Sequence, residues 1–191
     1  MSSEDIQFWL TALRETVTSY RRMIDGTVAQ LTDAEIARRP TDDVNSVAVI
    51  LRHLGGNLLS RWTDFLASDG EKPDRNRDME FSDWEGDRDS LIEYFDRGWT
   101  ALLAAIDSID STNIHQLIYI RGEPHTLTQA LLRSLTHMSY HVGQIAMVAR
   151  LVHTGQWQWL TIAPGQSSVH NQSTWGSPAS RGVAADQPSK K

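Results

Sequence analysis

Apolar side chains recur at three- and four-residue steps along four stretches of the chain, a spacing typical of amphipathic helices. The first stretch predicts a helix over residues 4–31. Its buried stripe would consist of Phe8, Leu10, Leu13, Val17, Tyr20, Ile24 and Val28. The other stretches predict helices over about 47–67, 87–109 and 126–152. Four amphipathic helices of this length favour an all-α fold, a four-helix bundle with one long crossover connection.

Capping signals mark two of the helix starts. Thr32 and Glu35 form a capping box for a short additional helix, which Pro40 would stop. Thr126 and Gln129 form a second capping box at the start of the fourth long helix. Both signals predict where the chain turns from a connection into a helix.

The second long helix can be capped by Asn45 or Ser46, and it contains Gly55 and Gly56 in its interior. Each glycine costs about 1 kcal/mol relative to alanine in a helix. Two in succession indicate close approach of another backbone or of a ligand. The alternative is that a well-packed helix simply tolerates them.

The connections are polar and differ in length. Residues 69–89 are rich in charged side chains and predict a long surface connection. Residues 114–120 predict a short extended segment before the fourth helix, followed by a turn at 121–124. The apolar pattern dissolves after position 159. We therefore expect a bundle over residues 1–173 and a flexible C-terminal tail over 174–191.

Composition narrows the functional classes. The net charge of −6 disfavours a phosphate-binding surface, so we expect no nucleic acid partner. The absence of cysteine excludes a disulfide framework, a thiolate metal site and a cysteine nucleophile. No apolar run is long enough for a membrane helix, and the N-terminus lacks a signal-peptide pattern. These features predict a cytoplasmic protein that acts on a small molecule.

Two histidines on the fourth helix have the spacing of metal ligands. His137 and His141 lie four residues apart, so their imidazoles should be about 40° apart around the helix and about 6 Å apart along it. Zinc proteases use the same pair, but there a glutamate follows the first histidine. Met138 occupies that position here. A protease of that type is therefore disfavoured.

The third candidate ligand is His53, which sits among Ile50, Leu51 and Leu54 on the inward face of the second helix. A buried imidazole costs free energy unless its nitrogens find partners. One divalent ion would satisfy one nitrogen of each ring. Three neutral nitrogen ligands suit zinc first, with nickel, iron, cobalt and manganese as alternatives, and they leave room for water or substrate. The competing interpretation is three separate core histidines.

Other polar residues could act beside such an ion. Asn57 and Arg61 follow His53 at four-residue steps, Gln144 follows His141 by three, and Arg121 occupies the predicted turn. The alternative roles are solvation of a helix end for Arg61 and buried polar contacts for the amides. Structural or surface roles are expected for the remaining histidines, His115, His125, His153 and His170. The core is expected to contain Trp62, Trp99 and Tyr140.

Three segments resemble the DinB-like superfamily: residues 45–58 (NSVAVILRHLGGNL), 69–73 (DGEKP) and 140–145 (YHVGQI). They are most similar to a branch of uncharacterised bacterial proteins described as domains of unknown function, and the resemblance covers about residues 5–172. It implies a four-helix bundle with a single three-histidine metal site. One ligand comes from the second helix and two, four residues apart, come from the fourth. The corresponding residues are His53, His137 and His141.

The resemblance also implies chemistry. Superfamily members of known activity include bacillithiol S-transferases and a mycothiol-dependent maleylpyruvate isomerase, in which the metal activates the sulfur of a low-molecular-weight thiol. We therefore expect a metal-dependent enzyme of the S-transferase type with a thiol co-substrate, in which Asn57, Arg61 or Arg121 would hold the electrophile. The alternatives are a metal-dependent hydrolase and a non-catalytic, stress-related metal-binding bundle.

Assembly can be predicted on similar grounds. Several bundles of this superfamily form homodimers. The first helix carries apolar groups beyond its main stripe, namely Ile6, Trp9 and Met23. These extra groups predict a homodimer.

Overall fold

The computed structural model describes residues 2–175 and contains two compact units, residues 1–157 and 158–191. The first unit contains the helical bundle. The second contains a short helix, α6 (Ser167–Trp175), which the apolar pattern did not predict. The expectation that the bundle domain extends to position 173 stays a prediction. The expected flexible tail falls largely on residues 176–191, which lie outside the described part of the chain.

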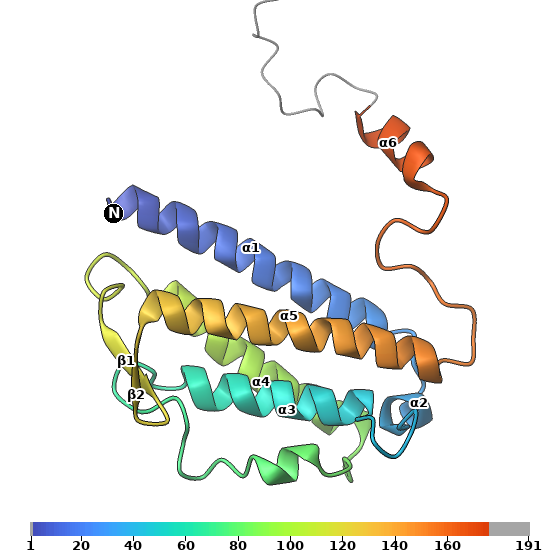
Figure 1. Ribbon diagram of the computed structural model, residues 1–191, viewed down its shortest axis with the longest axis horizontal. Coiled ribbons are helices and arrows are strands. Elements are labelled where there is room, and N and C mark those ends of the chain that lie inside the picture. Colours follow the sequence, from blue (N-terminus) through green and yellow to red (C-terminus); the bar gives the residue numbers. More distant parts are fainter. Residues whose placement is uncertain (1, 176–191) are drawn as a thin grey trace, which may run out of the picture. The chain divides into compact units, whose positions relative to one another are not determined.

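Four long helices form the bundle and confirm the all-α prediction (Figure 1). They are α1 (Ser3–Val28), α3 (Val47–Trp62), α4 (Arg88–Asp107) and α5 (Leu127–Val152). α3 packs along α4, α1 packs along α5, and α3 also contacts α5. The short α2 (Asp33–Ala37) follows α1, and a 3-10 helix, η1 (Asp78–Phe81), lies in the long connection from α3 to α4. The largest fully buried side chains include Ile24, Leu51, Leu54, Leu58, Leu91, Phe95, Leu102 and Leu131.

The predicted capping signals are confirmed. Thr32 and Glu35 form the reciprocal capping box of α2, and Thr126 and Gln129 form that of α5. Ser46, the second of the two candidates, caps α3 through a hydrogen bond from the backbone N–H of Val49 to its hydroxyl. Local side-chain chemistry therefore sets these helix starts.

α3 ends at Trp62, five residues before its predicted end. The chain leaves the helix and reaches a positive φ of 48° at Asp64, a conformation that cannot continue an α-helix. It then folds back along the last turn of α3. The hydroxyl of Ser60 donates to the carbonyl oxygen of Gly70 at 3.1 Å and accepts from the backbone N–H of Lys72 at 3.0 Å. This return places residues 69–72 beside the end of α3.

A two-stranded hairpin precedes α5. β1 (Leu117–Ile120) pairs antiparallel with β2 (Glu123–Thr126), and the pair closes at Ile120 and Glu123. The intervening Arg121 and Gly122 both have positive φ, 56° and 75°, as a two-residue type I′ hairpin turn requires. The extended segment and turn were predicted, but the second strand was not, because Pro124 argues against a strand.

The predicted buried stripe of α1 was wrong at Phe8, whose side chain is 81% exposed. Phe8 lies two residues, about 200° of helix rotation, from both Ile6 and Leu10. Those two are buried, so Ile6 belongs to the stripe instead. Trp9 and Met23 also pack partly against the core. The apolar groups that motivated the homodimer are thus used within the chain, and the homodimer stays a prediction.

The glycines of α3 are explained by close approach. A Cβ on Gly55 would lie 2.9 Å from the Cα of Phe95 in α4. A Cβ on Gly98 of α4 would lie 2.9 Å from the carbonyl carbon of Gly55 and closer still to its oxygen. Absence of side chains at both positions therefore lets the two helix backbones touch.

Within residues 2–175, no helix combines the length and apolarity that crossing a bilayer would require.

Candidate metal centre

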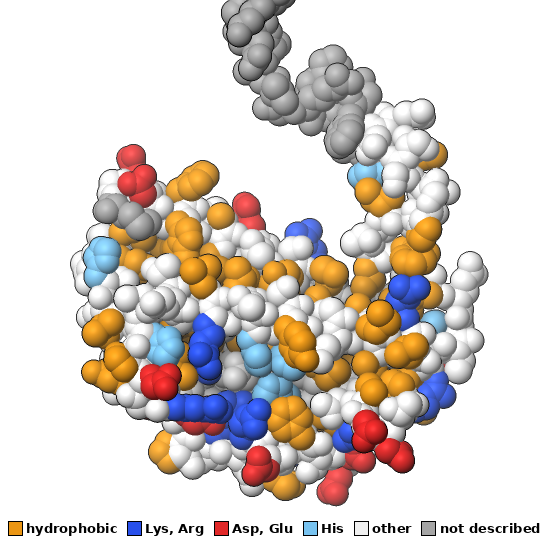
Figure 2. All heavy atoms as spheres, viewed as in Figure 1, with side chains coloured by type: hydrophobic (Ala, Val, Ile, Leu, Met, Phe, Trp, Pro, Cys, Tyr) orange, Lys and Arg blue, Asp and Glu red, His pale blue; other side chains and the backbone are white. Residues whose placement is uncertain are grey.

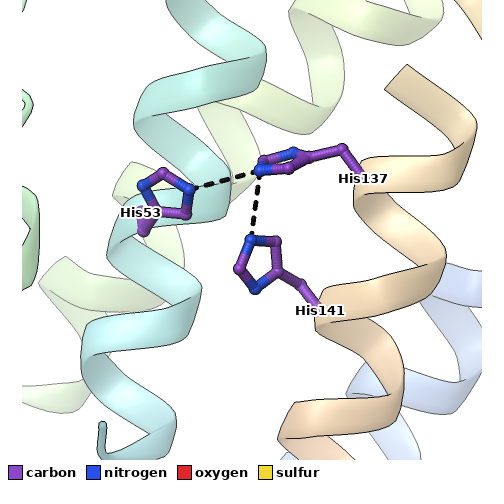
Figure 3. Close-up of side chains that lie close together, drawn as sticks. All are labelled: His53, His137 and His141. Atoms are coloured by element: carbon purple, nitrogen blue, oxygen red, sulfur yellow. Dashed lines mark hydrogen bonds between the residues drawn. The ribbon is translucent and has the colours of Figure 1, made fainter. Parts of the chain in front are cut away.

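Three histidine side chains from two helices converge on one point (Figure 3). The Nε2 atom of His137 lies 3.3 Å from Nε2 of His53 and 3.1 Å from Nε2 of His141. All three rings offer a ligand atom within 4.8 Å of the others. Nitrogen ligands of a tetrahedral zinc ion, each about 2.0–2.1 Å from the metal, are about 3.3 Å apart. The three histidines form one cluster that could hold a metal ion, as their spacing predicted.

Hydrogen bonds on the far side of two rings orient them for this role. Nδ1 of His53 lies 2.8 Å from Oε2 of Glu80, and Nδ1 of His141 lies 2.8 Å from Oε1 of Gln144. Both oxygens are acceptors, so both Nδ1 atoms carry the proton and both Nε2 atoms present lone pairs. His137 has at most one proton on Nε2 and cannot satisfy both neighbours. A cation at the point of convergence would satisfy all three.

Burial keeps the rings of His137 and His141 neutral. Burial, followed by the nearby His141 and His53, lowers the pKa of His137 to about 3. Burial, followed by His53, lowers the pKa of His141 to about 4. Neutral imidazole is the form that binds metals. At neutral pH these two rings can therefore bind a cation without first losing a proton.

Glu80, the partner of His53, was missed by sequence analysis. It lies in η1, within the segment predicted to be a surface connection, yet it is buried. Its carboxylate also accepts from Nε and Nη2 of Arg75, at 2.8 and 2.7 Å. Burial raises the pKa of Glu80, but hydrogen bonds from His53 and Arg75 outweigh this and hold the pKa below its usual range. The ionised carboxylate fixes the orientation of His53.

A signal for Glu80 was present in the sequence at Gly56. A Cβ there would lie 2.9 Å from Cδ of Glu80 and 2.8 Å from Oη of Tyr94. The helical glycine beside His53 thus makes space for the group that supports the histidine. The sequence predicted a close approach at this glycine without showing which residue supplies it.

A cavity of about 550 Å³ opens beside the histidines. Its lining consists of His53, Asn57, Arg61, Arg77, Arg121, Arg133, Thr136, His137 and Tyr140. On this face of the molecule, basic side chains gather next to histidines (Figure 2). The structure thus brings the candidates Asn57, Arg61 and Arg121 together with two of the histidines. Gln144 is not in the lining, because it supports His141 from behind.

Several lining residues were not anticipated. Tyr140 was expected in the core. Its side chain instead lines the cavity and is 63% exposed. It follows His137 by three residues and lies at the outer side of the helix face that carries His137. Arg77, Arg133 and Thr136 were missed. Arg133 stands one helical turn before His137, so the four-residue spacing that identified the histidine pair could have extended to it. No comparable spacing in the sequence indicates that Arg77 lines the cavity.

Arg61 is buried rather than solvating a helix end. It is 5% exposed, and its Nε has no hydrogen-bond partner. Burial, followed by the charges of Arg133 and Arg75, lowers its pKa to about 10, which leaves it charged at neutral pH. A Cβ on Gly70 would lie 3.0 Å from Cδ of Arg61, so this glycine provides room for the side chain.

Arg121 is placed by Asp69. The Asp69 carboxylate accepts hydrogen bonds from the backbone N–H groups of Glu71, Arg121 and Gly122, at 2.7, 2.8 and 2.7 Å. Burial raises the pKa of Asp69, but these three bonds outweigh it and the pKa is lowered. The carboxylate thereby fixes the hairpin turn at the cavity. This accounts for the acidic and glycine residues that begin the 69–73 segment.

The remaining histidines lie elsewhere. His115 precedes β1, His125 lies in β2, and His153 caps the C-terminus of α5. His170 lies in the second compact unit. The histidine cluster includes none of them.

Comparison with known proteins places the chain in a family. No curated protein and no solved structure matches it. One family model, described as "Protein of unknown function (DUF1572)", matches residues 5–166. This match covers most of the chain, including all three histidines and the lining of the cavity. The chain therefore belongs to the DUF1572 family of proteins of unknown function.

Proposed function

We propose that this protein is a divalent-metal-dependent enzyme of the S-transferase type. His53, His137 and His141 would hold one ion, with zinc as first choice and nickel, iron, cobalt or manganese as alternatives. A low-molecular-weight thiol would be the activated co-substrate. We also propose that the family is a branch of the DinB-like superfamily. The bundle fold supports this assignment, as do the single histidine on α3 and the four-spaced pair on α5.

The observation that carries this proposal is a three-histidine cluster bordering a cavity without carboxylates. Three neutral ligands would leave a coordination position for a substrate. When bound, a divalent ion would lower the pKa of a thiol or water that reaches it and so supply a nucleophile at neutral pH. The cavity gives a small molecule access to that position.

The absence of acids from the lining favours a thiol over water. Hydrolases of the zinc-protease type use a glutamate to take a proton from water. The lining residues include no aspartate or glutamate, and the nearby Glu80 is engaged by His53 and Arg75. A thiol, with an ordinary pKa of about 8.5, needs much less help to lose its proton than water does. Asn57 and Arg121, which line the cavity, would hold the electrophile.

Cobalt substitution tests the proposal. A thiolate ligand gives cobalt an intense near-ultraviolet charge-transfer band. The cobalt-loaded protein should develop this band with at least one thiol among cysteine, glutathione, coenzyme A and bacillithiol, and His137→Ala should abolish it. If no thiol gave a band while the metal-loaded protein cleaved an ester or amide, the hydrolase would replace the transferase. If neither occurred, the non-catalytic bundle would replace both.

A further inference from the structure

We infer that the cavity takes a small substrate bearing a carboxylate or phosphate group, bound by Arg61 and Arg133. Describing this ligand as a substrate rests on the proposed function. Its binding at the arginines does not, because those side chains are present whether or not a metal is held.

The side chains that line the cavity carry a net positive charge. It includes four arginines and no acid. Nearby ion pairs join Arg75 to Glu71 and Glu80, and Arg121 to Glu71. Among the described residues, neither Arg61 nor Arg133 forms an ion pair. In a chain of net charge −6, a cluster of unneutralised guanidinium groups in a concave site concentrates positive potential there. Anions are thereby favoured over neutral or cationic ligands.

Arg61 is the most informative of these residues. A buried guanidinium without a counter-charge is costly, since both its hydration and its hydrogen bonds are lost. Here Nε is buried without a hydrogen-bond partner. The cations Arg133, Arg75 and Arg121 disfavour the charge of Arg61, and together with burial they outweigh the favourable charge of Glu71. An arginine with a purely structural role would be paired, as Arg75 is. An anionic ligand would supply the missing partner.

Helix geometry places Arg61 and Arg133 at one end of the cavity. Arg61 lies two turns beyond His53 on α3, about 12 Å along the helix, and Arg133 lies one turn before His137 on α5, about 6 Å along it. The charge of Arg133 acts on Arg61, so the two belong to the same end. A ligand spanning from them to the histidines would carry its oxyanion about 6–12 Å from the reacting atom. A cavity of about 550 Å³ holds molecules of this size.

Isothermal titration calorimetry tests the inference, with succinate and inorganic phosphate as anionic probes and succinamide as the neutral match of succinate. At least one anion should bind with one-to-one stoichiometry and more weakly as ionic strength rises, and succinamide should not bind. Arg61→Gln and Arg133→Gln should each weaken binding about tenfold or more. Arg22→Gln, which changes an exposed arginine on α1, should leave it unchanged. The preferred probe shows whether carboxylate or phosphate is the natural group.

His137→Ala separates this inference from the proposed function. Anion binding that survives in His137→Ala and is lost in the arginine variants supports the arginine site, even if the wild-type protein holds no metal and the proposed function fails. Binding that is lost in His137→Ala but kept in both arginine variants would place the anion on the ion and overturn the inference. Absence of binding by both anions to the folded wild-type protein would also overturn it. Because Arg133 is exposed, its variant remains informative if Arg61→Gln does not fold.

Discussion

Replacing Gly98 with alanine should destabilise the bundle, because α3 and α4 touch backbone to backbone at this position. The new Cβ would lie 2.9 Å from the carbonyl carbon of Gly55, whereas ordinary van der Waals contact begins at 3.4 Å. Neither partner can rotate away, since both belong to helix backbones. The helices must therefore separate by at least about half an ångström, which loosens the contacts between them along the interface.

The magnitude follows from two opposing effects. Overpacking a well-filled interface costs about 1–3 kcal/mol, and immovable backbone atoms place this case at the upper end. Alanine returns about 1 kcal/mol of helix propensity relative to glycine. We expect a net loss of about 2 kcal/mol in the free energy of unfolding. For a chain of this size, that loss corresponds to about 4–8 °C in melting temperature.

Gly143→Ala is the matched control. Gly143 is also helical, in α5, but a Cβ there meets nothing within 4 Å. This variant should gain up to about 1 kcal/mol from helix propensity alone. Urea unfolding followed by circular dichroism measures both variants, provided that their m-values agree. If Gly98→Ala were as stable as Gly143→Ala, the close approach of α3 and α4 could not be the reason for the glycines.

Three further predictions concern other parts of the chain. Glu80→Gln should weaken metal binding about 10- to 100-fold by releasing His53, as measured by competition with a chromophoric chelator, and unchanged affinity would show that Glu80 does not support the site. Bonds from Thr32 and Thr154 lower the pKa of Glu35 from 4.5 to about 2, so its stabilising effect is full above pH 4.5 and is lost as the pH falls towards 2. Wild type should lose more stability than Glu35→Gln between pH 5 and 2 in urea titrations, and parallel curves would contradict this. Truncation after Ser173 should leave the melting temperature unchanged, and a drop of many degrees would show that the tail is needed for folding.

Local signals in the sequence were sufficient to locate the four long helices, apart from the end of α3, and to identify the three histidines that lie together. The apolar periodicity and the capping boxes at Thr32 and Thr126 depend on neighbours within one or two turns, and these were confirmed. The three candidate metal ligands could be predicted from the sequence for the same reason. His137 and His141 share a helix face, and His53 lies among apolar residues that point inward.

Features that depend on distant chain segments could not be predicted in this way. Glu80 contacts His53 from a polar connection and lies 27 residues later in the chain. The only indication of this contact in the sequence was the glycine at position 56. Arg133 and Arg77 join the cavity from α5 and from the long connection. Phe8 was misplaced for a different reason. Phe8 is apolar, but it lies on the face of α1 opposite the buried stripe and is exposed.

Metal stoichiometry tests the central claim most directly. The protein should be purified without an affinity tag, equilibrated with zinc, freed of unbound ions and measured by mass spectrometry for metal per chain. We expect one ion per chain for the wild-type protein and for His170→Ala. We expect well below one ion per chain for each of His53→Ala, His137→Ala and His141→Ala. Retention of one ion per chain in all three ligand variants would contradict the claim.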